Sequence, residues 1–416
     1  MLASVAGVVG LGNLWRFPYM VGENGGGSFV AAYLVCVVLI GIPLAMIEVA
    51  AGKHFRRGPV GTFRSISPVW GPWFGWFLVG MTILIMSYYF VITGWTLGYA
   101  INAFRGVFQD FTSFTEGFNS LWLFAIVVFV VFLGLRMGIA GVEKTSIVLL
   151  PMLVLIVGGL AIYAQTIEGS KAGRDFYFSF DIDTFASSQT WRMAAGQAFY
   201  SLSIGLGFLI TYGSYAPERL NIVGSTLAIA ATNSAISLVA GLMVFPIIFA
   251  FGIPPDTGSE LSFSALPSLL GELAAGRIIG IGLFSLLFLA AFTSCYGGMM
   301  IPMTAFRFEF GISRTKAALV AIGITSAIGL PSALSFTSAE VHLGTRPFLE
   351  QIDYLTGSGI VLVAGIVGAA LVAWLVPLKR LVNAFESDAK WPGTAVVLIA
   401  RWLPIAAIAI YLVSLF

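Results

Sequence analysis

Apolar segments long enough to cross a bilayer follow one another along this chain, and no other feature restricts its fold so strongly. A transmembrane helix needs about 20 mostly apolar residues. About eleven such segments lie near residues 1–21, 27–50, 74–104, 121–135, 145–165, 191–216, 222–252, 276–306, 316–333, 347–377 and 393–416. Charged residues make up only 10% of the 416 residues, against about 25% in soluble domains. We therefore predict an all-α polytopic membrane protein, and the composition excludes a soluble or nucleic-acid-binding protein.

Lysine and arginine residues concentrate in alternate loops. Thirteen lie on the side of the loop that follows the second span, and six lie on the opposite side. The positive-inside rule then predicts a multi-pass protein of the cell membrane with a cytoplasmic N-terminus, and an odd number of spans predicts an extracellular C-terminus. The first segment has no basic start and continues through Trp15 and Arg16. We therefore interpret it as a span and not as a signal peptide.

Two spans contain glycine-rich, polar runs at mid-membrane depth, at residues 7–13 (GVVGLGN) and 201–207 (SLSIGLG). Glycine destabilises a helix interior, and unwound backbone is tolerated in a membrane only where it lines a cavity or is buried in protein. The runs occupy the first and sixth spans, which correspond in two blocks of five helices. This pairing is typical of the binding site of inverted-repeat transporters. Close helix packing through small residues is the alternative for either run alone.

Uncharged polar side chains accompany the two runs. They are Asn13, Ser201, Asn233, Thr293 and Ser294. Their amide and hydroxyl oxygens suit a hard monovalent cation, although each hydroxyl could instead bond to its own helix. His54 and His342 fall on opposite sides of the predicted membrane, and no nucleophile–base pair or metal set is clustered in the sequence. We therefore do not expect an enzyme.

The segment GLGNLWRFPY at residues 10–19, followed by ENGGG at residues 23–27, resembles the first-helix signature of the neurotransmitter:sodium symporter family. The likeness continues at residues 94–98, 196–203 and 293–294, and so covers essentially the whole chain. It implies a single transporter domain over residues 1–416 with a 5+5 inverted repeat whose first and sixth helices are unwound. Repeat one would span 1–165, repeat two 191–377, and an additional helix 393–416.

The resemblance implies a sodium-coupled symporter of amino acids that works by alternating access. A channel of this fold, a symporter of another family with the same inverted repeat, and a non-transporting amino-acid-binding membrane protein are the alternatives. The Arg-Phe-Pro signature at residues 16–18 argues against another family. Nothing in the sequence indicates an oligomeric state.

Two sodium sites are implied by position. The first would use Val8, Asn13, Ser201, Asn233 and the substrate carboxylate. The second would use Ala6, Val9, Ala290, Thr293 and Ser294. The substrate would contact Val8, Gly10, Gly12, Ile85, Tyr89, Phe199, Tyr200, Ser201, Ser203, Leu206, Ser294 and Gly298, with Met299 in place of Gly298 if the alignment shifts by one residue. Amine transporters of the family carry an Asp at the position of Gly10, so we expect an amino acid, medium to large and apolar or aromatic.

A chloride site is implied by the same resemblance. Its ligands would be Tyr33, Gln197, Ser201, Asn233 and Ser237. Prokaryotic relatives that ignore chloride place an acid at the position of Ser237, so a serine there predicts chloride dependence. A small packing residue is the alternative interpretation.

Gating residues also match by position. Arg16 and Asp353 would form the outer charged pair, with Tyr89 and Phe199 as the aromatic lid beneath it. Glu309 matches the acid of the inner gate, but its usual basic partner, which precedes the first span, has no counterpart in the 416 residues. We expect the remaining intramembrane acids, Glu23 and Glu48, to bond to backbone groups that the breaks leave open.

Overall fold

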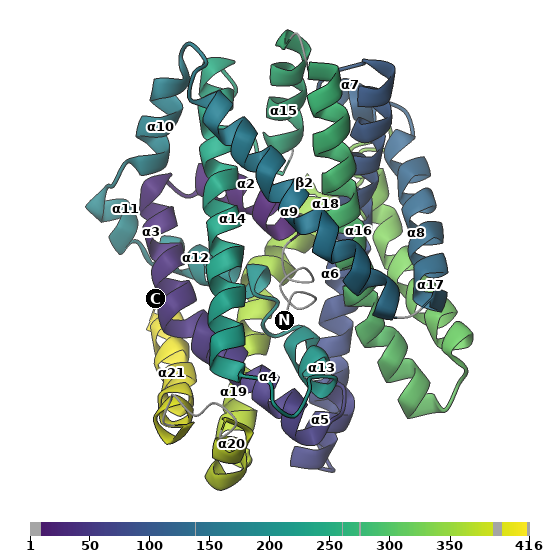
Figure 1. Ribbon diagram of the computed structural model, residues 1–416, viewed down its shortest axis with the longest axis vertical. Helices are drawn as coiled ribbons and strands as arrows, with labels where there is room; N and C mark the ends of the chain where they lie inside the picture. Colours follow the sequence, from purple (N-terminus) through teal and green to yellow (C-terminus); the bar gives the residue numbers. More distant parts are fainter. Residues whose placement is uncertain (1–9, 138, 260, 274–275, 386–392, 414–416) are drawn as a thin grey trace.

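The computed structural model describes residues 10–137, 139–259, 261–273, 276–385 and 393–413 of the chain. Long helices stand side by side and run between the two ends of the molecule (Figure 1). The described strands are two residues each and pair antiparallel, β1 (His342–Leu343) with β2 (Arg346–Pro347). The predicted all-α class is confirmed.

Each predicted span is mostly helical over its described residues, with π-helical turns (η) in some of them and a break in the sixth. The helices are η1 (Gly12–Arg16) and α2 (Phe17–Glu23); α3 (Gly27–Cys36), η2 (Val37–Gly41) and α4 (Ile42–Phe55); α6 (Gly71–Arg105); α8 (Asn119–Met137); α9 (Ile139–Ala164); α12 (Ser188–Ser201) and α13 (Phe208–Ser214); α14 (Ile222–Ala250); α16 (Gly276–Phe310); α17 (Arg314–Leu334); α18 (Phe348–Asp353), η3 (Tyr354–Ile360) and α19 (Val361–Leu375); and α21 (Gly393–Val413). Among the described residues, seven continuous helical segments are long and apolar enough to cross a membrane.

The sixth span is interrupted as predicted. Turn residues 202–207 separate α12 from α13, and three of them have left-handed backbone, with φ of +58° at Ser203, +77° at Gly205 and +72° at Gly207. A Cβ atom at Gly205 would lie 2.5 Å from the backbone nitrogen of Gly365, so only glycine fits there. The break in the first span can be followed only from Gly10, a bend that precedes η1, because residues 1–9 lie outside the described part.

Packing of the surrounding helices places both breaks near the centre of the bundle. α6 packs along α16, α12 packs on α3, α13 packs on α4, and η1 packs on α14. Glu48 of α4 stabilises the second break, since its Oε1 accepts a hydrogen bond of 2.9 Å from the Gly205 N–H. The expectation that acids bond to open backbone groups is thus confirmed for Glu48. For Glu23 it stays a prediction; among the described residues its side chain lines an outer cavity.

Short helices that the sequence analysis did not predict connect the spans. They are α5 (Pro59–Ile66), α7 (Phe111–Thr115), α10 (Ser170–Phe178), α11 (Ile182–Ala186), α15 (Leu261–Glu272) and α20 (Leu378–Phe385). α7, α10 and α15 lie at one end of the bundle, and α5 and α20 lie at the other (Figure 1). Side-chain caps begin two of them: Asp110 accepts from Ser113 N at 3.0 Å, and Asp181 accepts from Thr184 N at 2.7 Å.

Candidate functional site

A cavity of about 50 Å³ lies between the two breaks. Its walls are Gly10, Gly12, Thr82, Ile85, Met86, Tyr89, Tyr200, Ser201, Ser203, Leu206, Phe208, Ser294, Gly298 and Ile301. The described members of the predicted substrate set therefore line one cavity, apart from Phe199, while Val8 lies outside the described residues. Sequence reasoning missed Thr82, Met86, Phe208 and Ile301. Thr82 lies about one helical turn from Ile85, and Met86 lies next to it. This proximity to a predicted residue is the signal that could have identified both.

One end of this cavity is polar. A Cβ atom at Gly10 would lie only 2.6 Å from both the Tyr89 Oη and the Ser294 Oγ. The Tyr89 hydroxyl accepts a hydrogen bond of 2.9 Å from the Leu11 N–H, so its own proton is left to donate. A hydroxyl donor from α6 therefore faces the unwound backbone at the start of η1, an arrangement suited to an oxyanion.

The other end of the cavity is apolar and is limited by Met86. A Cβ atom at Gly298 would lie 2.5 Å from the Met86 sulfur, so the thioether fills the space that this glycine leaves. Met299 does not replace Gly298 in the cavity. Its sulfur accepts from the Thr325 Oγ1 at 3.6 Å, because adjacent residues of a helix point about 100° apart and Met299 faces α17.

The prediction that Phe199 forms the aromatic lid is wrong by one position in the sequence. A Cβ atom at Gly365 would lie 3.0 Å from two ring carbons of Phe199. The Phe199 ring therefore packs on α19 and away from the cavity. Tyr200 takes its place, with the Arg16 guanidinium 4.6 Å from its ring centroid. Tyr88 was also missed, and its hydroxyl oxygen lies 3.2 Å from the Tyr200 hydroxyl oxygen.

Three residues of the predicted second sodium site lie together on α16. The hydroxyls of Thr293 and Ser294 both donate to the Ala290 carbonyl, at 2.8 and 3.1 Å. These are the helix back-bonds that the sequence left open as the alternative. The hydroxyl oxygens keep lone pairs that a cation could use. Ala6 and Val9, the other predicted ligands, lie outside the described residues.

The predicted first sodium site centres on Asn13. Its Oδ1 accepts from the Gly10 N–H at 3.2 Å, and its Nδ2 donates to the Asn233 Oδ1 at 2.8 Å. The side chain thereby joins the start of η1 to α14. Ser201, another predicted ligand of this site, ends α12 and donates to the Ala198 carbonyl at 3.3 Å. Amide and carbonyl oxygens therefore lie around Asn13, as a hard cation requires.

Four of the five predicted chloride residues form two groups. In one, Ser237 accepts from the Asn13 Nδ2 at 2.7 Å, and the buried Nδ2 of Asn233 has no hydrogen-bond partner among the described residues. In the other, the hydroxyls of Tyr33 and Ser201 lie 3.3 Å apart. Gln197 belongs to neither group: its side chain contacts Arg16, and its Nε2 donates to the Gly12 carbonyl at 2.9 Å. A buried amide donor without an acceptor is the kind of group that an anion satisfies.

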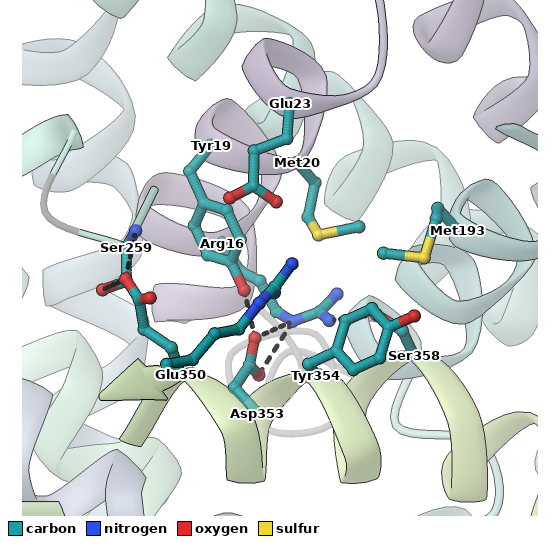
Figure 2. A pocket seen from close by; sticks show the side chains of 11 residues that line it. Arg16, Tyr19, Met20, Glu23, Met193, Ser259, Glu350, Asp353, Tyr354 and Ser358 are labelled. Carbon is teal, nitrogen blue, oxygen red and sulfur yellow. Dashed lines mark hydrogen bonds and ion pairs between the residues drawn. The ribbon is translucent and has the colours of Figure 1, made fainter. Parts of the chain in front are cut away.

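A buried ion pair closes the cavity on one side. Arg16 Nε donates to Asp353 Oδ1 and Oδ2 at 3.0 and 3.2 Å, and both side chains are almost fully buried. Tyr19 also donates to Asp353, and Tyr88 does so at 2.7 Å. Figure 2 shows Asp353 on its helix beneath Arg16 and Tyr19, with Glu23 on the opposite side of the small outer cavity. The predicted outer pair therefore meets in the structure.

Glu309 at the other end of the molecule has a partner within the chain. Arg64 of α5 binds it through both terminal nitrogens, with Nη1 donating to Oε1 at 3.1 Å. α5 and α16 both pack on α6, so this ion pair joins elements that are already held together. Arg64 is thus a different partner for Glu309 from the basic residue before the first span that the resemblance implied.

The fold and the central site together define a multi-pass membrane transporter whose sixth span is interrupted. The model of the sodium:neurotransmitter symporter family matches residues 1–120 and 116–415. The chain belongs to this family and is a sodium-dependent transporter. It is 32% identical over 381 residues to a sodium-dependent transporter of Haemophilus influenzae, covering 85% of this chain and 83% of the relative.

Two further comparisons bear on the site. The crystal structure of MhsT in complex with L-phenylalanine superposes with a TM-score of 0.94 at 32% identity, covering 100% of this chain and 97% of MhsT. The human sodium- and chloride-dependent GABA transporter 2 is 26% identical over 446 aligned positions, which cover 92% of this chain and 73% of that transporter.

Proposed function

We propose that this protein is a sodium-coupled, chloride-dependent symporter of amino acids that favours apolar or aromatic side chains. The geometry at Gly10 carries the proposal. With two hydroxyl oxygens 2.6 Å from where its Cβ would be, this position excludes the Asp of amine transporters and leaves the Tyr89 hydroxyl to donate to a substrate carboxylate. The similarity to MhsT, solved with L-phenylalanine, supports the substrate class.

Coupling between sodium and substrate follows from shared ligands. A carboxylate held at Gly10 and Tyr89 lies next to Asn13, whose amide bonds to the Gly10 N–H. A sodium ion there would be bound by the amide oxygens and by the substrate itself, so each binds more tightly when the other is present. A second sodium at Thr293 and Ser294 would stabilise the first break against α16.

Alternating access is supported by the two ends of the path. The Arg16–Asp353 pair closes one end. Toward the other end, a cavity of about 430 Å³ reaches Ile301, which also lines the central cavity. The basic residues of this larger cavity, Arg56, Arg57 and Arg64, support a cytoplasmic opening by the positive-inside rule.

Uptake into proteoliposomes tests the function. We expect labelled phenylalanine or leucine to accumulate only when sodium and chloride gradients are imposed. Competition across the twenty amino acids should rank large apolar side chains first. A preference for glycine or alanine would contradict the substrate class, and saturable binding without accumulation would identify a non-transporting binding protein.

Chloride dependence has its own test at Ser237. Replacing chloride by gluconate should abolish uptake by the wild type, because the Asn13–Asn233–Ser237 cluster would lack its anion. In Ser237→Glu the fixed carboxylate should restore uptake in gluconate, whereas Ser237→Ala, a neutral control, should remain dependent on chloride. Wild-type uptake that is equal in both anions argues against the site.

A further inference from the structure

A lateral groove of about 310 Å³ lies between α12 and the helical segment η3–α19. Its walls are Arg192, Met193, Tyr354, Leu355, Ser358, Gly359, Ile360 and Val363. Leu355, Ile360 and Val363 are 41%, 37% and 42% exposed, which is high for large apolar residues of a spanning segment. These side chains face the surroundings of the bundle, so the groove opens toward lipid.

Polarity changes along the groove. Arg192 and the hydroxyl of Tyr354 lie at one end, with an Nη2 to Oη distance of 3.4 Å. Tyr354 and Val363 lie nine residues apart along the helical segment η3–α19, which is more than two turns. The lining below the polar end is Leu355, Ile360 and Val363. The groove is thus polar at its interfacial end and apolar along its length, like a phospholipid.

The Arg192 guanidinium lacks a counter-charge within the described part of the chain, where the ion pairs are Arg16–Asp353 and Arg64–Glu309. Arg192 lies near the start of α12, which begins at Ser188, so the partial positive charge of the helix N-terminus adds to its own. A cation in a spanning segment is costly unless it is paired or hydrated. An anionic group at the interface would supply the missing charge.

We propose that this groove binds one glycerophospholipid, with the phosphate on Arg192 and an acyl chain over Gly359. A Cβ atom at Gly359 would meet no other atom within 4 Å, so the chain passes over open backbone. Met193, Tyr354 and Ser358 line both this groove and the outer gate cavity. Ser358 accepts from Arg16 Nη2 at 2.7 Å, so the acyl chain lies directly behind a residue of the gate.

Filling the groove tests the acyl-chain half of the proposal. The probe is phosphatidylglycerol with sixteen-carbon chains, counted on the purified transporter by native mass spectrometry. Gly359→Leu should retain one lipid fewer than the wild type, because its side chain occupies the groove without a clash. Gly323→Leu on α17, where a Cβ also meets nothing within 4 Å, is the matched control and should retain the wild-type number. Equal retention by both variants would overturn the site.

Changing the charge tests the phosphate half. Arg192→Gln should weaken binding of this phosphatidylglycerol about tenfold, the effect of losing a hydrogen bond to a charged group. Arg192→Lys should restore most of the lost affinity. A diacylglycerol with the same chains lacks the phosphate, so the wild type and both variants should bind it equally weakly. Unchanged affinity in Arg192→Gln would overturn the proposal. So would cross-linking between two copies of this protein at Leu355, because the groove would then be buried in a dimer.

Discussion

Gly10 determines which chemical group can approach the first break. Adding a single methyl group there brings carbon to 2.6 Å from the Tyr89 and Ser294 hydroxyl oxygens, closer than real contacts allow. We expect Gly10→Ala to raise the KM for amino-acid uptake at least tenfold while the protein remains folded, because the methyl group occupies the carboxylate position. Gly80→Ala, in the same helix as Tyr89 but with open space around its Cβ, is the control. A wild-type KM in Gly10→Ala would contradict the assignment.

Met86 sets the size of the substrate that the apolar end accepts. Its sulfur occupies the space beside Gly298, and an unbranched thioether is among the most adaptable side chains in a protein interior. Met86→Ala should shift competition toward tryptophan and phenylalanine and away from smaller side chains. Gly298→Ala should do the reverse, because its methyl group pushes Met86 into the cavity. Identical selectivity in both variants would show that this end does not contact substrate.

Single residues show where sequence reasoning succeeds. Asn13 could be predicted because it lies in the long first-helix motif, and Tyr89 and Ser294 because the resemblance to the family carries them over by position. Phe199 was misassigned since it neighbours Tyr200 on a helix, and a motif does not say which of two adjacent rings turns inward. Met86 carries no motif at all, and its role depends on the space that Gly298 leaves.

At the scale of elements, the turn between α12 and α13 depends on glycine for two separate reasons. Gly205 has a φ of +77°, and its Cβ would collide with the Gly365 nitrogen. Gly205→Ala should therefore lower the free energy of unfolding by more than the roughly 1–2 kcal/mol of left-handed backbone alone. Gly311→Ala isolates that backbone cost, because Gly311 has a φ of +63° and open space around it. Thermal unfolding in detergent compares the two, and equal losses would exclude the packing contribution.

The spanning helices could be predicted from the sequence, whereas the π-helical turns and most of the short connecting helices could not. Apolar runs of about 20 residues predicted the spans because the bilayer imposes that length. The glycine-rich runs predicted where the sixth span breaks. The π-helical turns η2 and η3 and the short helices α10 and α15 left no such pattern, since their geometry follows from packing between spans. The capping residues Asp110 and Asp181 are a signal from which α7 and α11 could have been predicted.

Across the whole molecule, a few buried charges join segments far apart in the chain. Arg16 contacts Asp353, Gln197 and Ser358, and so ties η1 to α18, α12 and η3. The sequence predicted the pair from the resemblance, because an arginine in a span requires a partner. It could not predict Arg64 as the partner of Glu309, since that contact depends on how α5 lies beside α16.

Removing one charge of the gate should affect both stability and transport. Asp353→Asn leaves the fully buried Arg16 without its anion, and we expect a loss of about 3–5 kcal/mol in the free energy of unfolding. Tyr88→Phe removes one hydrogen bond to the same carboxylate and should cost only about 1–3 kcal/mol. The double variant Arg16→Gln/Asp353→Asn should recover most of the stability, because no buried charge is left unpaired, but not the uptake, since the charged pair no longer closes the outer side. Recovery of uptake in the double variant would mean that the pair stabilises the fold without acting as a gate.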